Sequence, residues 1–232
     1  MNTSKVIAGV MKWGLWGSKF DAPAYEHIIK ESISMGVTTF DHADIYGDYT
    51  TEEEFGHVLR KEPSLRQQMQ LITKCGIRRP CANRPQFKIK SYDTSYNHII
   101  ESVETSLENL GTDYIDALLI HRPDVIMNAD EIAEAFTQLK QQGKVLHFGV
   151  SNFTPSQVAM LNSRVKVEIN QVQASATYLH PFIDGTLDQC QELGIMPMAW
   201  SPLGGGNLFA ATDDERTLRI TAVAEILGNK YS

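Results

Sequence analysis

The chain has 232 residues, of which 42% are hydrophobic and 21% are charged, a composition typical of a globular protein that buries a sizeable core. Its formal net charge of −7 at pH 7 argues against nucleic acid or an anionic membrane surface as the main partner. No apolar run approaches the roughly 20 residues that a membrane-spanning helix needs. The first residues also lack the pattern of a secretory signal.

Three cysteines, Cys75, Cys81 and Cys190, are odd in number and show no close ligand spacing. They therefore suggest neither a disulfide framework nor a zinc cluster. Reduced thiols in a cytoplasmic protein are the expectation.

One pattern recurs along the chain: an amphipathic helix ends at a glycine, a short apolar strand follows, and polar residues end the strand. In the predicted helix 97–111, apolar residues recur on one face, and Gly111 is the expected left-handed cap. Asn128 is the expected N-cap of the following helix. The predicted helices cover 21–36, 97–111, 128–143, a segment that begins with the capping box at 154–157, and 184–194.

The apolar runs between these helices are short and mostly do not alternate with polar residues, as is typical of strands buried on both faces of a parallel sheet. Helices that alternate with such strands indicate an α/β fold. Seven strands are predicted, near residues 6–11, 37–41, 70–74, 115–120, 145–150, 167–172 and 195–200.

Two α/β architectures fit this alternation, a doubly wound sheet and a barrel. A dinucleotide-binding doubly wound sheet favours G-x-G-x-x-G after its first strand, and the sequence has no such motif, since the GGG at 204–206 lacks that spacing. Polar residues also end nearly every strand, which fits the active face of a (β/α)₈ TIM barrel. We therefore expect residues 1–232 to form a single barrel domain.

An eighth strand is missing from this pattern, because the chain ends in RITAVAEILGNKYS, which has helical spacing. A barrel closes only when its last strand pairs with its first, and open sheet edges are costly. The expectation is that the barrel is incomplete at its C-terminal end and that the natural protein continues.

The strand ends supply a set of polar and aromatic residues that a closed barrel brings to one face. Singly, each has an ordinary structural explanation. A metal site at Asp41, His42, Asp44 and His121 is disfavoured, because neighbouring strand residues point to opposite faces and no HxH or HExxH pair is present. The set comprises Asp41, Asp44, Tyr46, Lys74, His121, Ser151, Asn152, Asn170, Gln171, Trp200 and Ser201.

Four of these residues have the chemistry of carbonyl reduction, in which the oxygen gains a proton as the carbon gains hydride. Tyr46 has an unperturbed pKa near 10, and a nearby Lys74 ammonium is expected to lower this pKa. Asp41 would keep the ammonium charged, and His121 would orient the carbonyl. His42 and Asp44 are expected to be structural.

Other strand ends suit a nicotinamide cofactor. Ser151, Asn152 and Gln171 are neutral groups that can hydrogen-bond a carboxamide, and Trp200 offers a flat face for the ring. The glycines of SPLGGG, residues 201–206, allow backbone N–H groups to approach a pyrophosphate.

These motifs together resemble the aldo-keto reductase family. FDHADIYG is similar to its D-x-A-x-x-Y-G motif, and the other matching segments follow in family order between about residues 9 and 206: LITKCG, LLIHRPD, GVSNF, NQVQ and AWSPLGGG. DHADIYGDY, HRPD and DGTLDQ resemble the bacterial YdhF-like branch. The resemblance implies an NADP-dependent reductase of small-molecule aldehydes and ketones.

The same resemblance implies a role for each site residue. Tyr46 is the general acid, Lys74 and Asp41 tune it, and His121 positions the carbonyl. The cofactor NADP(H) would contact Ser151, Asn152, Gln171, Trp200, Ser201, Leu203 and Gly204. Two departures are evident, a Trp at position 200 where the family often has Tyr, and no counterpart of the Lys- and Arg-bearing segment that follows the eighth strand and binds the 2′-phosphate. The choice between NADP and NAD is therefore open.

Two regions bear on the substrate. Trp13 and Trp16 follow the first strand and either wall a carbonyl pocket or belong to the barrel packing. The long segment 76–97 carries five basic residues and is either a solvated loop or a lid that prefers anionic substrates.

Two other functions remain as alternatives to the reductase. A lyase would use Lys74 as a Schiff-base nucleophile. A non-catalytic module would bind a cofactor or a partner without turnover, although it would not need all four of Tyr46, Lys74, Asp41 and His121.

Overall fold

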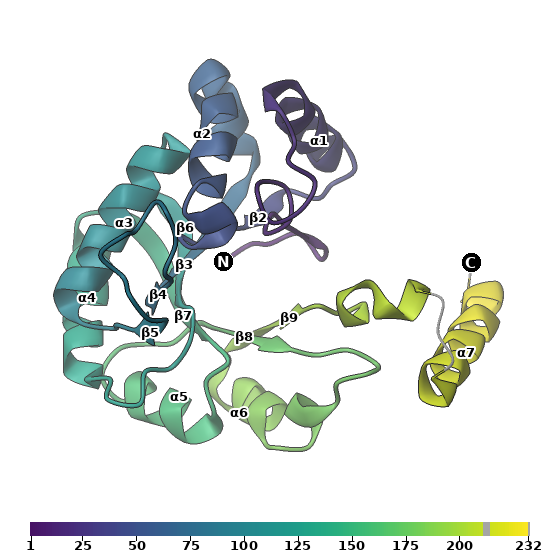
Figure 1. The fold of residues 1–232 in the computed structure, drawn as a ribbon. Helices are drawn as coiled ribbons and strands as arrows, with labels where there is room; N and C mark the ends of the chain where they lie inside the picture. Colours follow the sequence, from purple (N-terminus) through teal and green to yellow (C-terminus); the bar gives the residue numbers. More distant parts are fainter. Residues whose placement is uncertain (211–213, 232) are drawn as a thin grey trace. The chain divides into compact units, whose positions relative to one another are not determined.

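A computed structural model describes residues 1–210 and 214–231 of the chain. The chain divides into two compact units, Met1–Ile169 and Asn170–Ser232, and each is described by itself. Figure 1 labels their helices and strands.

The first unit contains a parallel sheet with the order β1-β2-β3-β6-β7. The pairing register places Gly9, Asp41, Ile72, Ala117 and His147 side by side across the five strands. Because all strands run in the same direction, their carboxyl ends gather at one edge, where the polar residues lie. The strands are β1 (Ile7–Gly9), β2 (Thr39–Asp41), β3 (Gln70–Cys75), β6 (Ile115–Ile120) and β7 (Val145–Ser151).

Helices connect these strands and lie on the outer side of the curved sheet (Figure 1). This is the alternating strand–helix architecture of a (β/α)₈ barrel. The caps have the predicted chemistry: Asn128 accepts the N–H of Asp130, Thr154 forms its capping box with Gln157, and Gly111 has φ 65°. The helices are α1 (Ala22–Ser34), α2 (Thr51–Lys61), α3 (Tyr96–Leu110), α4 (Ala129–Gln141) and α5 (Pro155–Asn162).

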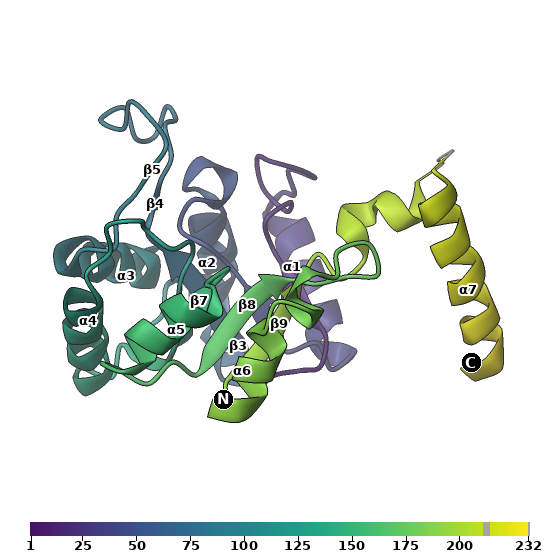
Figure 2. The ribbon, with the colours of Figure 1, turned by 90° about the horizontal axis from the view of Figure 1, so that it is seen from below.

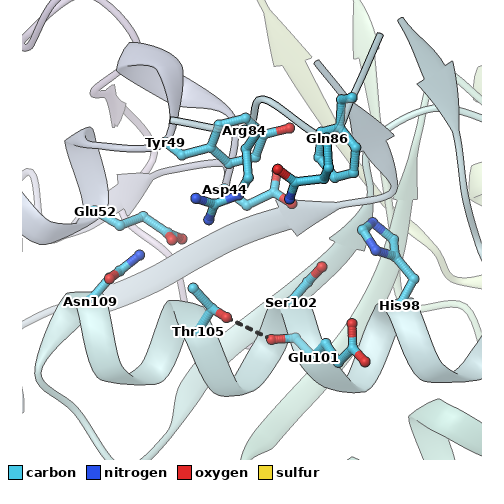
Figure 3. A pocket seen from close by; sticks show the side chains of 11 residues that line it. Asp44, Tyr49, Glu52, Arg84, Gln86, His98, Glu101, Ser102, Thr105 and Asn109 are labelled. Carbon is cyan, nitrogen blue, oxygen red and sulfur yellow. Dashed lines mark hydrogen bonds between the residues drawn. The ribbon is translucent and has the colours of Figure 1, made fainter. Parts of the chain in front are cut away.

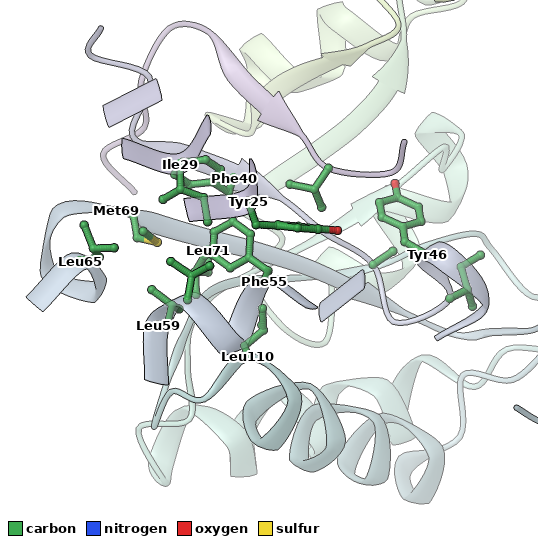
Figure 4. Packing of buried hydrophobic residues seen from close by; sticks show 14 of the residues in the cluster. Tyr25, Ile29, Phe40, Tyr46, Phe55, Leu59, Leu65, Met69, Leu71 and Leu110 are labelled. Carbon is green, nitrogen blue, oxygen red and sulfur yellow. The ribbon is translucent and has the colours of Figure 1, made fainter. Parts of the chain in front are cut away.

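The hydrophobic core lies between the sheet and these helices. Phe40 and Leu71, from neighbouring strands, and Phe55 of α2 are fully buried. Trp13 packs on Phe40 and Phe55, with ring centroids 6.2 and 6.3 Å apart, so it belongs to this core. Tyr46 lies at one edge of the same cluster (Figure 4), and therefore has an apolar side and a polar side.

The segment after β3, which the sequence predicts to be a long loop, contains two short strands. Strand β4 (Ile77–Arg78) pairs antiparallel with β5 (Ser91–Tyr92) and forms a hairpin. In Figure 2 this hairpin extends beyond the ends of the neighbouring strands. Two short 3₁₀ helices complete the first unit, η1 (Tyr46–Asp48) and η2 (Pro63–Gln68).

The second unit holds the remaining elements: β8 (Ile169–Gln173, which begins at the boundary), η3 (His180–Phe182), α6 (Thr186–Leu193), β9 (Met196–Trp200), η4 (Gly204–Phe209) and α7 (Glu215–Tyr231). Ala174 donates its N–H to the carbonyl of Trp200 at 3.4 Å. All seven predicted strands are present in the structure, and within the described residues no strand follows β9.

Among the described helices, none combines the length and apolar character needed to span a bilayer.

Candidate active site

A carboxylate, an ammonium and a phenol meet where β2 and β3 end. The Lys74 ammonium donates to Asp41 Oδ1 at 2.7 Å, to the carbonyl of His42 at 2.8 Å and to the Tyr46 hydroxyl at 3.3 Å. These three acceptors match the three N–H donors of an ammonium. Since Lys74 is 1% exposed, its geometry is fixed by these partners.

The backbone after β2 explains how Tyr46 reaches this position. His42 donates its N–H to Ile72 at 2.8 Å and Asp44 donates to the Lys74 carbonyl at 3.0 Å, so the chain stays attached to β3 after the strand ends. Gly47 then turns the chain with φ 59°, a left-handed conformation that suits glycine. The segment that carries Tyr46 is therefore held beside Lys74, whose ammonium contacts the phenol.

The pKa of Tyr46 is raised above 10, chiefly because burial disfavours the phenolate. Lys74 acts in the opposite direction but does not outweigh burial. The prediction of a lowered pKa is therefore wrong in direction, because Tyr46 is 8% exposed and its burial was not visible in the sequence. The pKa of Lys74 is raised: burial lowers it, and the charge of Asp41 and the contact with Tyr46 more than compensate. At neutral pH the site thus holds a neutral phenol beside a charged ammonium.

His121 follows β6 and lies beside Tyr46. Their ring centroids are 6.0 Å apart at an interplanar angle of 81°. Burial, and then the charge of Lys74, hold the pKa of His121 well below 6.5, so the imidazole is neutral. Its Nδ1 is buried and has no hydrogen-bond partner among the described residues. All four predicted polar groups, Asp41, Tyr46, Lys74 and His121, therefore lie together.

His42 and Asp44 lie away from this group. The His42 ring packs edge-on against Phe55, with centroids 4.6 Å apart, and burial lowers the pKa of His42 to about 3. Asp41 and His42 thus have different environments, as the alternation of strand residues predicts. Burial raises the pKa of the Asp44 carboxyl well above its usual range.

A cavity of about 150 Å³ lies beside Asp44, under the β4–β5 hairpin (Figure 3). One wall is α3, which contributes Ser102 and Thr105, and Arg84 of the hairpin segment lies near Asp44. Glu52, another lining residue, is buried and accepts hydrogen bonds from Thr73 at 2.6 Å and Ser106 at 3.0 Å. This cavity is separate from the contacts of Lys74.

Two predicted cofactor residues lie in the first unit. Ser151 ends β7 and is 1% exposed. Asn152 follows with φ 62°, and its amide donates to the Ser151 hydroxyl at 2.7 Å. Asparagine adopts this left-handed conformation more readily than most non-glycine residues.

The other predicted cofactor residues lie in the second unit. Gln171 is buried in β8, and Trp200 ends β9. Ser201 has φ 50°, Leu203 is largely exposed, and the glycines at 204–206 all have positive φ. An added Cβ would meet nothing within 4 Å at the second and third of these glycines, so the backbone there is open to a ligand.

The basic residues of the segment 76–97 are mostly attached to neighbours. Arg78 pairs with Asp93, and the Arg79 Nε donates to Asp48 Oδ1 at 3.0 Å. Arg84 lies 4.5 Å from the centroid of the Tyr49 ring. The sequence did not predict the pairing of Asp48 with Arg79. The only signal was the position of Asp48 directly after Tyr46 and Gly47.

Comparison with known proteins bears on this arrangement. The family model described as "Aldo/keto reductase family" matches residues 5–224. The chain is 51% identical to oxidoreductase YdhF of Escherichia coli over 199 residues, which are 85% of this chain and 66% of that protein. It is 40% identical to 6-dehydroglucose reductase of Agrobacterium fabrum over 213 residues, 90% of this chain and 71% of that protein. The chain thus spans about two thirds of the length of these relatives.

A solved structure gives the same picture of the fold. An aldo-keto reductase from Bacillus halodurans, described as its holo form, superposes with a TM-score of 0.78 and 28% sequence identity. The match covers 93% of this chain and 67% of that protein.

Proposed function

The chain belongs to the aldo/keto reductase family of oxidoreductases, and from its site we propose that it reduces aldehydes or ketones to alcohols with NADPH, using Tyr46 as the proton donor. The similarity to YdhF confirms the predicted branch. Activity on small-molecule carbonyls and a cytoplasmic location are parts of the proposal, the latter supported by three cysteines that are free thiols in the structure.

One observation carries this proposal: Lys74 donates to the oxygen of Tyr46. An ammonium has only donors, so the phenol oxygen acts as acceptor in this contact and its own proton stays available for another acceptor. Because burial raises the pKa of Tyr46, the phenol keeps this proton at neutral pH. When the carbonyl oxygen takes the phenol proton, Tyr46 becomes a phenolate, and the nearby Lys74 ammonium stabilises its negative charge.

His121 would position the carbonyl. Its ring is neutral and lies beside Tyr46, so an N–H of the imidazole can donate to the same oxygen without a competing charge. Asp41 acts through Lys74, whose charge it maintains.

Each of the two units, considered separately, contains residues whose chemistry fits part of a nicotinamide cofactor. Buried Ser151 and Asn152, which has a left-handed backbone, are neutral hydrogen-bonding groups at the end of β7. In the second unit, Gln171 would contribute an amide and Trp200 an aromatic face. Ser201, Leu203 and Gly204 would contact the cofactor next to Gly205 and Gly206, where the backbone is open to a ligand. When bound, NADPH supplies the hydride. We propose NADP(H) rather than NAD(H) on family grounds.

Sugar aldehydes are included among the proposed substrates, because one relative is named as a 6-dehydroglucose reductase. The Schiff-base alternative is disfavoured by the same contacts: Lys74 has a raised pKa and donates all its hydrogens, whereas a nucleophilic amine must be neutral.

NADPH oxidation with a panel of aldehydes tests the proposal, with wild type, Tyr46→Phe and the control Tyr96→Phe, which removes a phenol on α3. Loss of the proton donor should reduce kcat by about 10²- to 10⁴-fold, and the control should retain wild-type turnover. Equal turnover by Tyr46→Phe would refute the mechanism. Absence of any carbonyl reduction by wild type, despite NADPH binding, would favour a non-catalytic module.

A further inference from the structure

Trp16, Asp48 and Arg79 form a hydrogen-bonded group next to Tyr46 that the proposed proton transfer does not use. The Trp16 indole Nε1 and the Arg79 Nε both donate to Asp48 Oδ1, each at 3.0 Å. We call these three residues the Asp48 group.

The Asp48 group lies one side chain away from the phenol. The rings of Trp16 and Tyr46 have centroids 6.1 Å apart at an interplanar angle of 61°. The Arg79 guanidinium lies 4.7 Å from the centroid of the same indole. A substrate whose carbonyl contacts Tyr46 and whose chain follows Trp16 would therefore approach Arg79.

The backbone under this group is strained. Asp48 and Tyr49 have φ angles of 56° and 71°, directly after Gly47 at 59°. An aspartate adopts this conformation more readily than most residues, but a bulky residue such as Tyr49 adopts it only where its surroundings impose it, and such positions concentrate at functional sites. Here the Asn83 amide donates to the Asp48 carbonyl at 2.9 Å, and the Tyr49 hydroxyl accepts the Arg79 N–H at 2.9 Å. These two hydrogen bonds fix the backbone at Asp48 and at Arg79, the two residues whose side chains pair.

Part of the group's hydrogen-bonding capacity is unused. The Nη atoms of Arg79 and Oδ2 of Asp48 make no hydrogen bond with any residue in the described part of the chain. The Arg79 and Asp48 side chains are 43% and 26% exposed, so a ligand can reach both. Donors fixed beside an acceptor match hydroxyl groups, which both donate and accept.

Charge selects the class of ligand. The guanidinium and the carboxylate compensate each other, so the group as a whole attracts neither sign strongly. An anionic substituent at Arg79 would also face the Asp48 carboxylate at close range. A neutral ligand with several hydroxyl groups avoids this repulsion and uses both partners.

We propose that Trp16, Asp48 and Arg79 form a specificity site for the hydroxyl groups of a neutral polyhydroxylated aldehyde whose carbonyl contacts Tyr46. The position of the carbonyl rests on the proposed reduction. Arg79 and Asp48 are then specificity residues that bind the remote end of the substrate, and Trp16 supplies the surface between them and the reacting carbon.

Steady-state kinetics with a matched pair of substrates tests this site. D-erythrose and butanal both have four carbons and differ in hydroxyl groups. In Arg79→Met we expect the KM for D-erythrose to rise about tenfold, with its kcat and both constants for butanal within twofold of wild type. Arg84→Met is the control, because it removes the same charge from the same segment without touching Trp16. Equal losses for both aldehydes, or no loss for either, would overturn the site, as would an Arg79-dependent preference for erythrose 4-phosphate over erythrose.

A binding measurement separates this proposal from the reduction. Erythritol has the hydroxyl groups but no carbonyl, and its binding can be followed by tryptophan fluorescence, with Trp16→Phe to identify the responding residue and 1-butanol as the apolar control. Erythritol should bind wild type and lose about tenfold affinity in Arg79→Met. If this holds while neither aldehyde is reduced, the site stands and the proposed function fails. If butanal is reduced but erythritol binding does not depend on Arg79, the reductase stands and the site fails.

Discussion

The ammonium of Lys74 lies 2.7 Å from the Asp41 carboxylate, but only the carboxylate contacts solvent: the two side chains are 1% and 13% exposed. The two members of this ion pair therefore have unequal access to water. Removal of the carboxylate leaves an ammonium that water cannot reach, whereas removal of the ammonium leaves a carboxylate that water can reach. The two variants should therefore differ in their free energy of unfolding.

Asp41→Asn should destabilise the protein more than Lys74→Met. The first variant leaves a buried ammonium without a counter-ion, which costs about 3–5 kcal/mol, whereas the second leaves a carboxylate that water can reach and replaces the lysine stem with an apolar side chain. Urea unfolding of both variants checks this order. Equal losses, or the reverse order, would show that the pair is not as unequally solvated as the structure has it.

His42 should contribute to acid denaturation. Its pKa is about 3 when folded and 6.5 when unfolded, so the unfolded chain takes up the proton first. The contribution of neutral His42 to the free energy of unfolding is complete above pH 6.5. It falls by about 1.4 kcal/mol per pH unit as the pH drops from 6.5 towards 3. In His42→Leu the free energy of unfolding should depend less steeply on pH between 6 and 4. Parallel curves for the two proteins would contradict the burial of a neutral imidazole.

The reduction should show no inflection from His121 near neutral pH. Burial and the charge of Lys74 keep the pKa of His121 well below 6.5, so its protonation state is constant from about pH 6 to 9. A profile of log(kcat/KM) over this range measures it. An inflection near pH 6.5 that disappears in His121→Gln would be evidence against a neutral histidine at the carbonyl.

Gly56 should tolerate no side chain. A Cβ at this position in α2 would come far inside contact distance of the Asn109 carbonyl on α3. Overpacking of this kind costs about 1–3 kcal/mol. Gly56→Ala should lower the urea midpoint by a corresponding amount, while Gly9→Ala, whose Cβ meets nothing within 4 Å, should leave the midpoint near that of wild type.

Much of the fold could be predicted because its strands and helices differ in period and end at recognisable caps. Gly111 and Asn128 end and begin helices as their chemistry predicts. Helix α2 was not predicted, since it follows η1 after only a short turn and lacks a side-chain cap. The β4–β5 hairpin has strands of two residues, too short for a periodicity to reveal.

The site was predictable to the extent that strand ends converge in a parallel sheet. Tyr46, Lys74, Asp41 and His121 lie together for this reason. The direction of the Tyr46 pKa was not predictable, because it depends on how completely the surrounding side chains exclude water. The pairing of Arg79 with Asp48 was equally hidden, since it joins residues 31 positions apart across two turns.

The backbone hydrogen bond from Asp44 to Lys74 gives the site a mechanical property. Tyr46 lies only two residues beyond this hydrogen bond, so the backbone that carries the phenol stays beside β3 while the bond is intact. Separation of this segment from β3 requires the bond to break. Exchange of the Asp44 amide hydrogen with solvent would therefore report how often the segment that carries the proton donor opens.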